Sequence, residues 1–224
     1  KTTLMRMVNA MVTPTSGTVF VRGQDVAGED PVRLRRSIGY VLQEGGLFPH
    51  RTIADNVATV PRLEGASKQA SRERALELLE LVGLEADMAD RYPAQLSGGQ
   101  RQRVGVARAL ANRADILLMD EPFGALDPLV RADLQRELKE IQRALGTTIL
   151  FVTHDVDEAF TLGDQVAVLS TGGRIEQVGA PTELLTAPTS PFVADFVGAS
   201  RAARPVRVSG PGGLVVDEAG TPVG

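Results

Sequence analysis

The stretch LSGGQRQRVGVARALANRADILLMDEP at residues 96–122 is the most informative about the fold, because it joins a predicted capped helix to an apolar strand that ends in two acids. Its segment ILLMD is apolar up to the aspartate, as expected of a strand buried on both faces of a parallel sheet. Asp120 and Glu121 follow at the carboxyl end, where ligands bind in such sheets. Because neighbouring strand residues point to opposite faces, we expect one acid to hold a metal ion and the other to contact water. If the motif stood alone, both acids could instead cap a turn.

The beginning of the same stretch has the composition of an anion-binding helix N-terminus. Ser97 is a good N-cap, and Gly98 and Gly99 let the backbone approach a ligand closely. The free N–H groups at a helix start favour an anion. An isolated SGG could be a flexible turn, but here Gln100 leads directly into the helix and the acidic strand that follows it.

Two further polar residues close predicted strands. TTILFVTH (147–154) is predicted to be a second buried strand and ends in His154, and SIGYVLQ (37–43) is a predicted strand that ends in Gln43. The histidine could point into the same cleft as the two acids, and the glutamine could bond a metal-bound water. Each residue alone is a weak signal, since a lone histidine is more often structural.

The rest of the chain alternates strands with helices, which indicates an α/β domain. Residues 201–224 contain five glycines and three prolines, and are predicted to be a linker or the start of another module. The further elements predicted from periodicity and turn residues are a helix at 2–11, a hairpin or short strands at 15–26, helices with loops at 44–112 including one at 71–82, a helix at 129–145 and a Gly-Gly hairpin at 165–179.

Composition excludes several classes of site. The 224 residues contain no cysteine, which excludes disulfides, thiolate metal sites and cysteine nucleophiles. A net charge of −4 and an aromatic content of 4% argue against nucleic acid as a partner. No apolar run approaches the roughly 20 residues of a membrane-spanning helix. We therefore expect a cytoplasmic chain that reaches a membrane only through a partner.

Taken together, these motifs resemble the ATPase subunit of ABC transporters. The resemblance rests on LSGGQ, ILLMDE, ALD at 125–127, the glutamine after IGYVL and the histidine of FVTHD. It implies a P-loop NTPase fold of the ABC nucleotide-binding type, with a RecA-like parallel-sheet core, a small antiparallel β part and a helical subdomain. The implied parts are 1–43, the first part of the catalytic core; 44–112, the helical subdomain with the coupling loop and signature motif; 113–200, the second part of the core; and 201–224, a linker or truncated regulatory module.

By the same resemblance, the first three residues match the end of a G-x-x-x-x-G-K-[ST] phosphate loop. Lys1 would hold the β- and γ-phosphates of ATP, Thr2 would coordinate Mg²⁺, and Thr3 would contact the phosphates. The family carries a strand, an adenine-stacking aromatic residue and the loop glycines before this point. We therefore expect these 224 residues alone to bind ATP poorly.

The resemblance also assigns the polar residues at the strand ends. Asp120 would support the Mg²⁺, and Glu121 would be the general base for water. His154 would hold the attacking water and the γ-phosphate. Gln43 would link the metal to the coupling loop, and Asp127 would reach across a dimer.

In this family the signature motif acts on the ATP of a second subunit. Ser97, Gly98, Gly99 and Gln100 of one copy would close over ATP bound to the other, so a two-fold homodimer would form two sites. Closure and reopening would drive integral-membrane permease subunits. The ATPase would thus lie at the cytoplasmic face of the membrane, and a periplasmic or lipid-anchored binding protein would deliver the solute.

Three segments resemble importers of the osmoprotectants glycine betaine, choline, carnitine and proline. They are EGGLFPHRTIADNVATVPRLEG (44–65), RYPAQLSGGQRQRVGVARALA (91–111) and SPFVADFVG (190–198). FPHRTIADNV would grip the permease, although a plain surface loop is an open alternative. LVVDEAGTPVG (214–224) resembles the central hairpin of CBS regulatory modules, and a generic strand-turn-strand is equally open.

Three other functions compete with this prediction. An importer of another small solute, such as an amino acid, would use the same motor. A soluble ABC protein acting on DNA or ribosomes usually carries a coiled-coil insertion or a second fused cassette, and neither is visible. A catalytically dead regulatory cassette is disfavoured because both Glu121 and His154 are present.

Overall fold

The computed structural model describes residues 1–124, 126–198, 207–209 and 214–216. The chain forms two compact units, Lys1–His154 and Asp155–Gly224. Each unit is described by itself below. The division into four parts made from the sequence stays a prediction. Within the described residues, none of the helices combines the length and apolarity needed to cross a bilayer.

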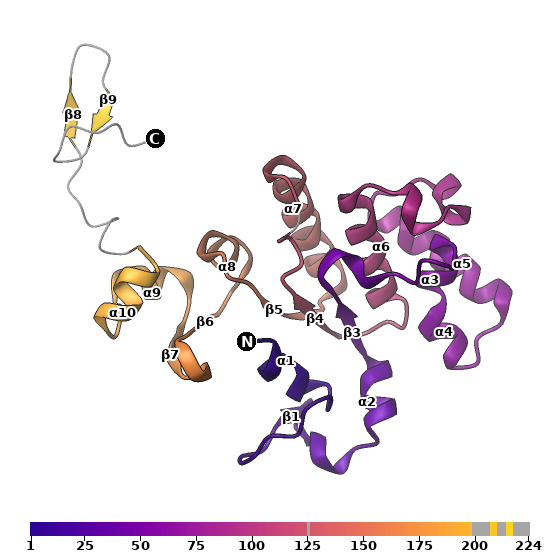
Figure 1. Ribbon diagram of the computed structural model, residues 1–224, viewed down its shortest axis with the longest axis horizontal. Coiled ribbons are helices and arrows are strands. Elements are labelled where there is room, and N and C mark those ends of the chain that lie inside the picture. The colour runs from indigo at the N-terminus through magenta and orange to yellow at the C-terminus, as the bar shows by residue number, and fades with distance from the viewer. Residues whose placement is uncertain (125, 199–206, 210–213, 217–224) are drawn as a thin grey trace. The chain divides into compact units, whose positions relative to one another are not determined.

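The first unit mixes helices with short strands, in the order expected of an α/β protein (Figure 1). Its helices are α1 (Thr2–Val8), α2 (Pro31–Ser37), α3 (Ile53–Val57), α4 (Thr59–Leu63), α5 (Lys68–Leu81), α6 (Gly98–Leu110) and α7 (Pro128–Leu145), with 3₁₀ turns η1 (Val26–Gly28), η2 (Gln43–Gly46), η3 (Ala86–Asp90) and η4 (Pro93–Gln95). Its strands are β1 (Phe20–Val21), β2 (Gln24–Asp25), β3 (Ile38–Val41), β4 (Ile116–Asp120) and β5 (Thr148–Val152).

A parallel sheet of order β3-β4-β5 forms the centre of this unit. The register pairs Ile38 with Ile116 and Ile116 with Thr148, so all three strands end at one edge. The predicted α/β class and the parallel arrangement are confirmed. The predicted hairpin near 15–26 is also confirmed, as the antiparallel pair β1-β2.

Strand β5 corrects one expectation. It was predicted to be buried, but Leu150 is 44% exposed and no residue of the strand is fully buried. The reason is topological: β4 is the strand paired on both sides, whereas β5 is at the edge of the described sheet. The strands predicted at 37–43 and 147–154 also extend too far, since β3 ends at Val41 and β5 ends at Val152. Gln43 and His154 therefore follow their strands rather than belong to them.

The two faces of the sheet are covered by different helices. Because side chains alternate along β4, Leu118 lies in a core cluster with Met5 of α1 and Leu34 of α2. Met119 lies on the opposite face, where it lines a pocket with residues of α6 and α7. Asp120 lies two residues beyond Leu118 on β4 and therefore points to the same face, the one covered by α1.

Local sequence explains where the main helices begin and end. Asp127 caps α7 by accepting from the amide of Val130 at 3.1 Å, and Gly146 ends it with a left-handed φ of 64°. Helix α1 is shorter than the predicted 2–11, because Asn9 is its C-cap and Ala10 takes a φ of 54°.

The second unit contains α8 (Val156–Leu162), α9 (Pro181–Thr186), α10 (Pro191–Phe196), the 3₁₀ turn η5 (Thr171–Gly173), and strands β6 (Val166–Leu169), β7 (Ile175–Gly179), β8 (Arg207–Ser209) and β9 (Leu214–Val216). The pairing of β6 with β7 confirms the predicted Gly-Gly hairpin, and its core is built on Val168, Leu184 and Val193. Strand β9 pairs with β8 upstream. Residues 217–224, the remainder of the predicted regulatory hairpin, lie outside the described residues.

Candidate active site

Five residues predicted from the motifs gather where β4 and β5 end, beside the first turn of α1. The hydroxyl Oγ1 of Thr2 donates to Oδ1 of Asp120 at 3.0 Å. The Nζ of Lys1 donates to the backbone carbonyl of Thr153 at 2.7 Å, next to His154. Residues distant in sequence are thus placed together by the sheet edge. Thr3 is exposed in the same turn of α1.

Glu121 and His154 form the second half of this cluster. The imidazole Nδ1 of His154 lies 3.3 Å from Oε2 of Glu121, and both side chains reach solvent. The backbone amide of Glu121 donates to the carbonyl of Val152 at 2.9 Å, which holds the two strand ends together. Glu121 has a φ of 46°, in the left-handed region that residues with a Cβ adopt at a cost. Strain of this kind is concentrated at functional sites.

The signature motif begins helix α6. Oγ of Ser97 accepts from the amide of Gln100 at 3.2 Å, and Oε1 of Gln100 accepts from the amide of Ser97 at 2.9 Å. This capping box confirms Ser97 as the N-cap. A Cβ on Gly99 would lie 2.8 Å from Cγ1 of Val130, so this glycine permits close packing of α6 on α7 within the chain. Gly98 has ordinary room for a side chain, and the approach of either glycine to a ligand stays a prediction.

The positions of Asp127 and Gln43 are known from the structure, but their predicted roles are not tested by it. Asp127 is exposed and uses one carboxylate oxygen to cap α7, so a contact across a dimer stays a prediction. Gln43 is the first residue of η2, directly after the β3 edge of the sheet, but its side chain lies outside what the structure describes.

The segment after η2 is a surface loop organised around Asn56, which is 0% exposed. Oδ1 of Asn56 accepts from the amide of Phe48 at 2.7 Å. Its Nδ2 lies 3.1, 3.2 and 2.9 Å from the carbonyl oxygens of Phe48, Arg51 and Thr52. The loop presents Phe48, 41% exposed, with the Arg51 guanidinium carbon 5.0 Å from its ring centroid. The motifs gave no signal for the role of Asn56, because its partners are backbone atoms.

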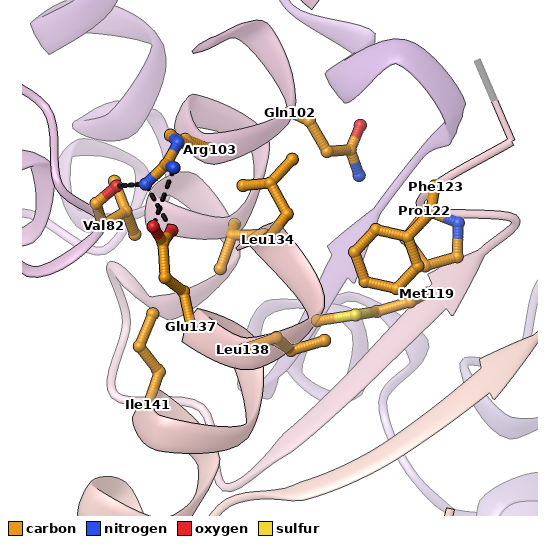
Figure 2. A pocket seen from close by; sticks show the side chains of 11 residues that line it. Val82, Gln102, Arg103, Met119, Pro122, Phe123, Leu134, Glu137, Leu138 and Ile141 are labelled. Atoms are coloured by element: carbon orange, nitrogen blue, oxygen red, sulfur yellow. Dashed lines mark hydrogen bonds and ion pairs between the residues drawn. The ribbon is translucent and has the colours of Figure 1, made fainter. Parts of the chain in front are cut away.

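A mostly apolar pocket lies behind the acidic strand, between α6, α7 and the segment after Glu121 (Figure 2). Arg103 of α6 forms an ion pair with Glu137 of α7 and donates from Nη1 to the carbonyl of Val82 at 2.7 Å. Gln102 is buried and lines the same pocket, and its Nε2 has no hydrogen-bond partner in the part of the chain that the structure describes. These contacts fix the signature helix to α7, and sequence reasoning did not find them.

Comparison with known proteins adds four findings. The family model described as ABC transporter matches residues 1–124. The glycine betaine/carnitine/choline transport ATP-binding protein OpuCA of Bacillus subtilis (strain 168) is 52% identical over 201 residues, which are 90% of this chain and 53% of that protein. The sulfate/thiosulfate import ATP-binding protein CysA of Brucella melitensis biotype 1 is 50% identical over 212 residues, 93% of this chain and 58% of that protein. A dimeric post-hydrolysis structure of the ATP-binding cassette MJ0796, bound to ADP and Pi, is similar at a TM-score of 0.70 and 34% identity, covering 80% of this chain and 79% of that chain.

The matches differ in how much of each protein they cover. The chain spans about half the length of the curated relatives it matches. By contrast, the match to the solved cassette extends over most of both chains. The matched family region includes both the Lys1–Thr2 end and the acidic strand of the cluster described above.

Proposed function

Because this chain belongs to the ABC transporter family of ATP-binding proteins, we propose that it is the ATP-hydrolysing subunit of an importer for quaternary amine osmoprotectants. The observation that carries the proposed ATP hydrolysis is the cluster of Lys1, Thr2, Asp120, Glu121 and His154 at one edge of the parallel sheet, whereas the proposed solute is supported by the similarity to osmoprotectant transport proteins. Phosphoryl transfer asks a protein chiefly for positioning and for compensation of negative charge. This cluster combines a cation, a hydroxyl, two carboxylates and an imidazole.

Each residue of the cluster then has a task in ATP hydrolysis. The ammonium of Lys1 balances charge on the β- and γ-phosphates. Glu121 accepts a proton from the attacking water, and His154, 3.3 Å away, holds that water beside the γ-phosphate. Gln43, as the first residue of η2, joins this edge of the sheet to the loop that follows.

The same edge fits Mg²⁺. Oγ1 of Thr2 and Oδ1 of Asp120 are hard oxygen donors only 3.0 Å apart, and they would hold the ion. Among the described residues, no group of three or more acidic or histidine side chains could form an all-protein cage. Mg²⁺ suits such an open site, because it keeps water and phosphate oxygens as ligands. When bound, it offsets charge on the phosphates.

A second copy of the chain completes the site. No hydrogen bond or ion pair links Ser97–Gln100 to the cluster within the residues that the structure describes, although both belong to the proposed reaction. A two-fold dimer in which the signature motif of one copy covers ATP on the other resolves this separation. Asp127, exposed at the start of α7, is available to the partner in the same arrangement.

The loop organised by Asn56 is the surface proposed to dock the permease. Its exposed Phe48 and the neighbouring Arg51 offer an apolar and a cationic contact, and Asn56 holds them in a fixed backbone shape. ATP-driven closure of the dimer would move this loop and the attached permease. The chain would then act at the cytoplasmic face of the membrane, with the solute delivered by a separate binding protein.

Glu121→Gln tests the proposed chemistry in the intact ATPase subunit. Loss of the base should lower ATP hydrolysis by about 10²–10⁴-fold while ATP still binds and holds a closed dimer. Glu140→Gln, the same change on the exposed face of α7, is the matched control and should hydrolyse ATP normally. Ser97→Arg should bind ATP but not hydrolyse it, since it obstructs the partner's γ-phosphate. Normal turnover by either site variant would reject its assigned role.

The solute needs a separate experiment, because a sulfate/thiosulfate import protein is about as similar to this chain as an osmoprotectant one. Uptake of radiolabelled glycine betaine, choline and sulfate should be measured in vesicles containing the cognate permease and binding protein. We expect uptake of the quaternary amines alone. Uptake of sulfate would leave the proposed ATPase role intact and would reject quaternary amines as the substrate class.

A further inference from the structure

The turn η2 is in direct backbone contact with the signature helix α6. Gly45 and Gly46 of the turn have left-handed φ values of 76° and 53°. A Cβ on Gly45 would lie 2.5 Å from the carbonyl oxygen of Arg101, and a Cβ on Gly105 would lie 2.9 Å from Cα of Gly45. Such distances are shorter than any real Cβ contact, so both glycines are required where turn and helix touch.

Arg108, one helical turn beyond Gly105, fastens this contact. Its Nη1 donates to the carbonyl of Gly46 at 2.8 Å, and its Nη2 donates to the carbonyl of Gly45 at 2.8 Å. A guanidinium can make both bonds at once because its donors form a planar fork, which an ammonium lacks. Burial lowers the pKa of Arg108 from its usual value. A partly buried cation whose guanidinium donates to two backbone carbonyls indicates a specific structural role.

The position of this contact relates it to all three segments proposed to act in transport. The turn begins at Gln43, next to the sheet edge that carries the acids. One residue separates its end from Phe48, where the loop proposed to dock the permease begins. Helix α6, to which it is fastened, begins at the signature motif. The turn and the helix that it contacts thus connect all three segments.

We propose that Arg108 is a positioning residue that locks η2 to α6, so that the turn after Gln43, the Phe48 loop and the signature motif move as one body. This inference rests on the proposed function, since it names the residue that transmits motion within that machinery. Loss of the lock should leave the nucleotide cluster intact and let the turn flex. Solute-dependent ATP hydrolysis would then fail while basal hydrolysis remained.

The test compares variants in the reconstituted transporter and in the intact ATPase subunit. Arg108→Met removes the fork and the charge, and Arg108→Lys keeps the charge but lacks the fixed planar fork that spans both carbonyls. Gly105→Ala presses the turn away from the helix and should behave as Arg108→Met does. Arg136→Met, which removes an exposed arginine on α7, is the control. ATPase rates with and without solute, KM for ATP, melting temperature and hydrogen exchange at the Gly45 amide are measured for each.

Arg108→Met should keep its KM for ATP and at least a third of basal hydrolysis, while solute stimulation falls at least tenfold. The Gly45 amide, bonded to the carbonyl of Leu42 at 3.0 Å, should exchange at least tenfold faster. Arg108→Lys should be intermediate, and Arg136→Met should match the unmodified protein. Unchanged stimulation, or an equal fall of basal and stimulated rates with a lower melting temperature, would overturn the proposal. If the unmodified transporter shows no solute stimulation, the proposed function fails instead, and the exchange rate at Gly45 alone decides whether Arg108 locks the turn.

Discussion

Replacement of Asn56 by alanine should lower the free energy of unfolding of the first unit, and the number of hydrogen bonds that Asn56 makes gives the expected size of the loss. The side chain is 0% exposed and accepts one hydrogen bond from the amide of Phe48 at 2.7 Å. Its Nδ2 carries two hydrogens and faces three carbonyl oxygens, so it donates at most two full bonds. Three bonds at a net value of about 1 kcal/mol each give a loss of about 3 kcal/mol in the free energy of unfolding.

Urea unfolding of the intact ATPase subunit, followed by circular dichroism, measures this loss. Asn112→Ala is the matched control, because the Nδ2 of Asn112 donates a single bond, to the carbonyl of Arg36 at 2.9 Å. The control should lose about 1 kcal/mol. If Asn56→Ala costs no more than the control, the loop does not depend on Asn56 and the reasoning is refuted.

Asn56→Asp adds a pH-dependent version of the same test. The variant keeps an acceptor for Phe48 but places a carboxyl group against three carbonyl oxygens in a buried site. Burial and the nearby carbonyl oxygens both disfavour the charged carboxylate, so they raise the pKa of that group in the folded state above its unfolded value of about 4. Stability should therefore be highest at low pH and fall as pH rises from about 4 through the raised folded pKa. A variant with no extra pH dependence relative to the unmodified protein would contradict this electrostatic account.

Three further predictions rest on other features of the first unit. Glu121→Gly should relieve the strain of the left-handed φ of 46° and raise the free energy of unfolding by roughly 0.5–1 kcal/mol, while abolishing ATP hydrolysis. A lower free energy of unfolding in urea would argue against strain at this residue. Gly39→Ala should lose about 3 kcal/mol in the same assay, because its Cβ would lie 2.4 Å from the carbonyl oxygen of Ala109; a near-neutral result would show that α6 can move off β3. The hydrogen bond from Arg22 lowers the pKa of Asp115 in the folded state. The stability that Asp115 contributes is therefore present above its unfolded pKa of about 4 and is lost as pH falls through the folded pKa. Asp115→Asn should remove this part of the acid sensitivity, and an unchanged dependence of stability on pH would contradict the prediction.

Much of the fold could be predicted because the patterns that define it are local. The apolar run ILLMD, the capping residue Ser97 and the stop at Gly146 each describe their own segment of chain, and the structure has a strand, an N-cap and a helix end there. Burial was less predictable. An apolar sequence such as that of β5 does not reveal whether its strand is paired on one side or on both, and here Leu150 is exposed at the edge of the described sheet.

The candidate site divides in the same way. Asp120, Glu121 and His154 could be selected because they end or follow predicted strands, and Lys1 could be selected because it resembles the lysine of a phosphate loop. Their mutual contacts, and the strained φ of Glu121, could not be selected in this way. They depend on the parallel register of β4 and β5, which brings two distant strand ends together.

The α/β class and the resemblance to the family could be recognised from the sequence, because strand and helix patterns and motif spacing are properties of the order of the side chains. Which atoms join η2 to α6 and shape the Phe48 loop became known only from the folded chain. Arg108 binds the carbonyls of Gly45 and Gly46, and Asn56 binds the backbone of its own loop. Every residue carries the same backbone carbonyl, and every residue except proline carries the same backbone N–H. The path of the folded chain therefore determines which side chains bind these backbone groups, and the pattern of side chains in the sequence does not reveal it.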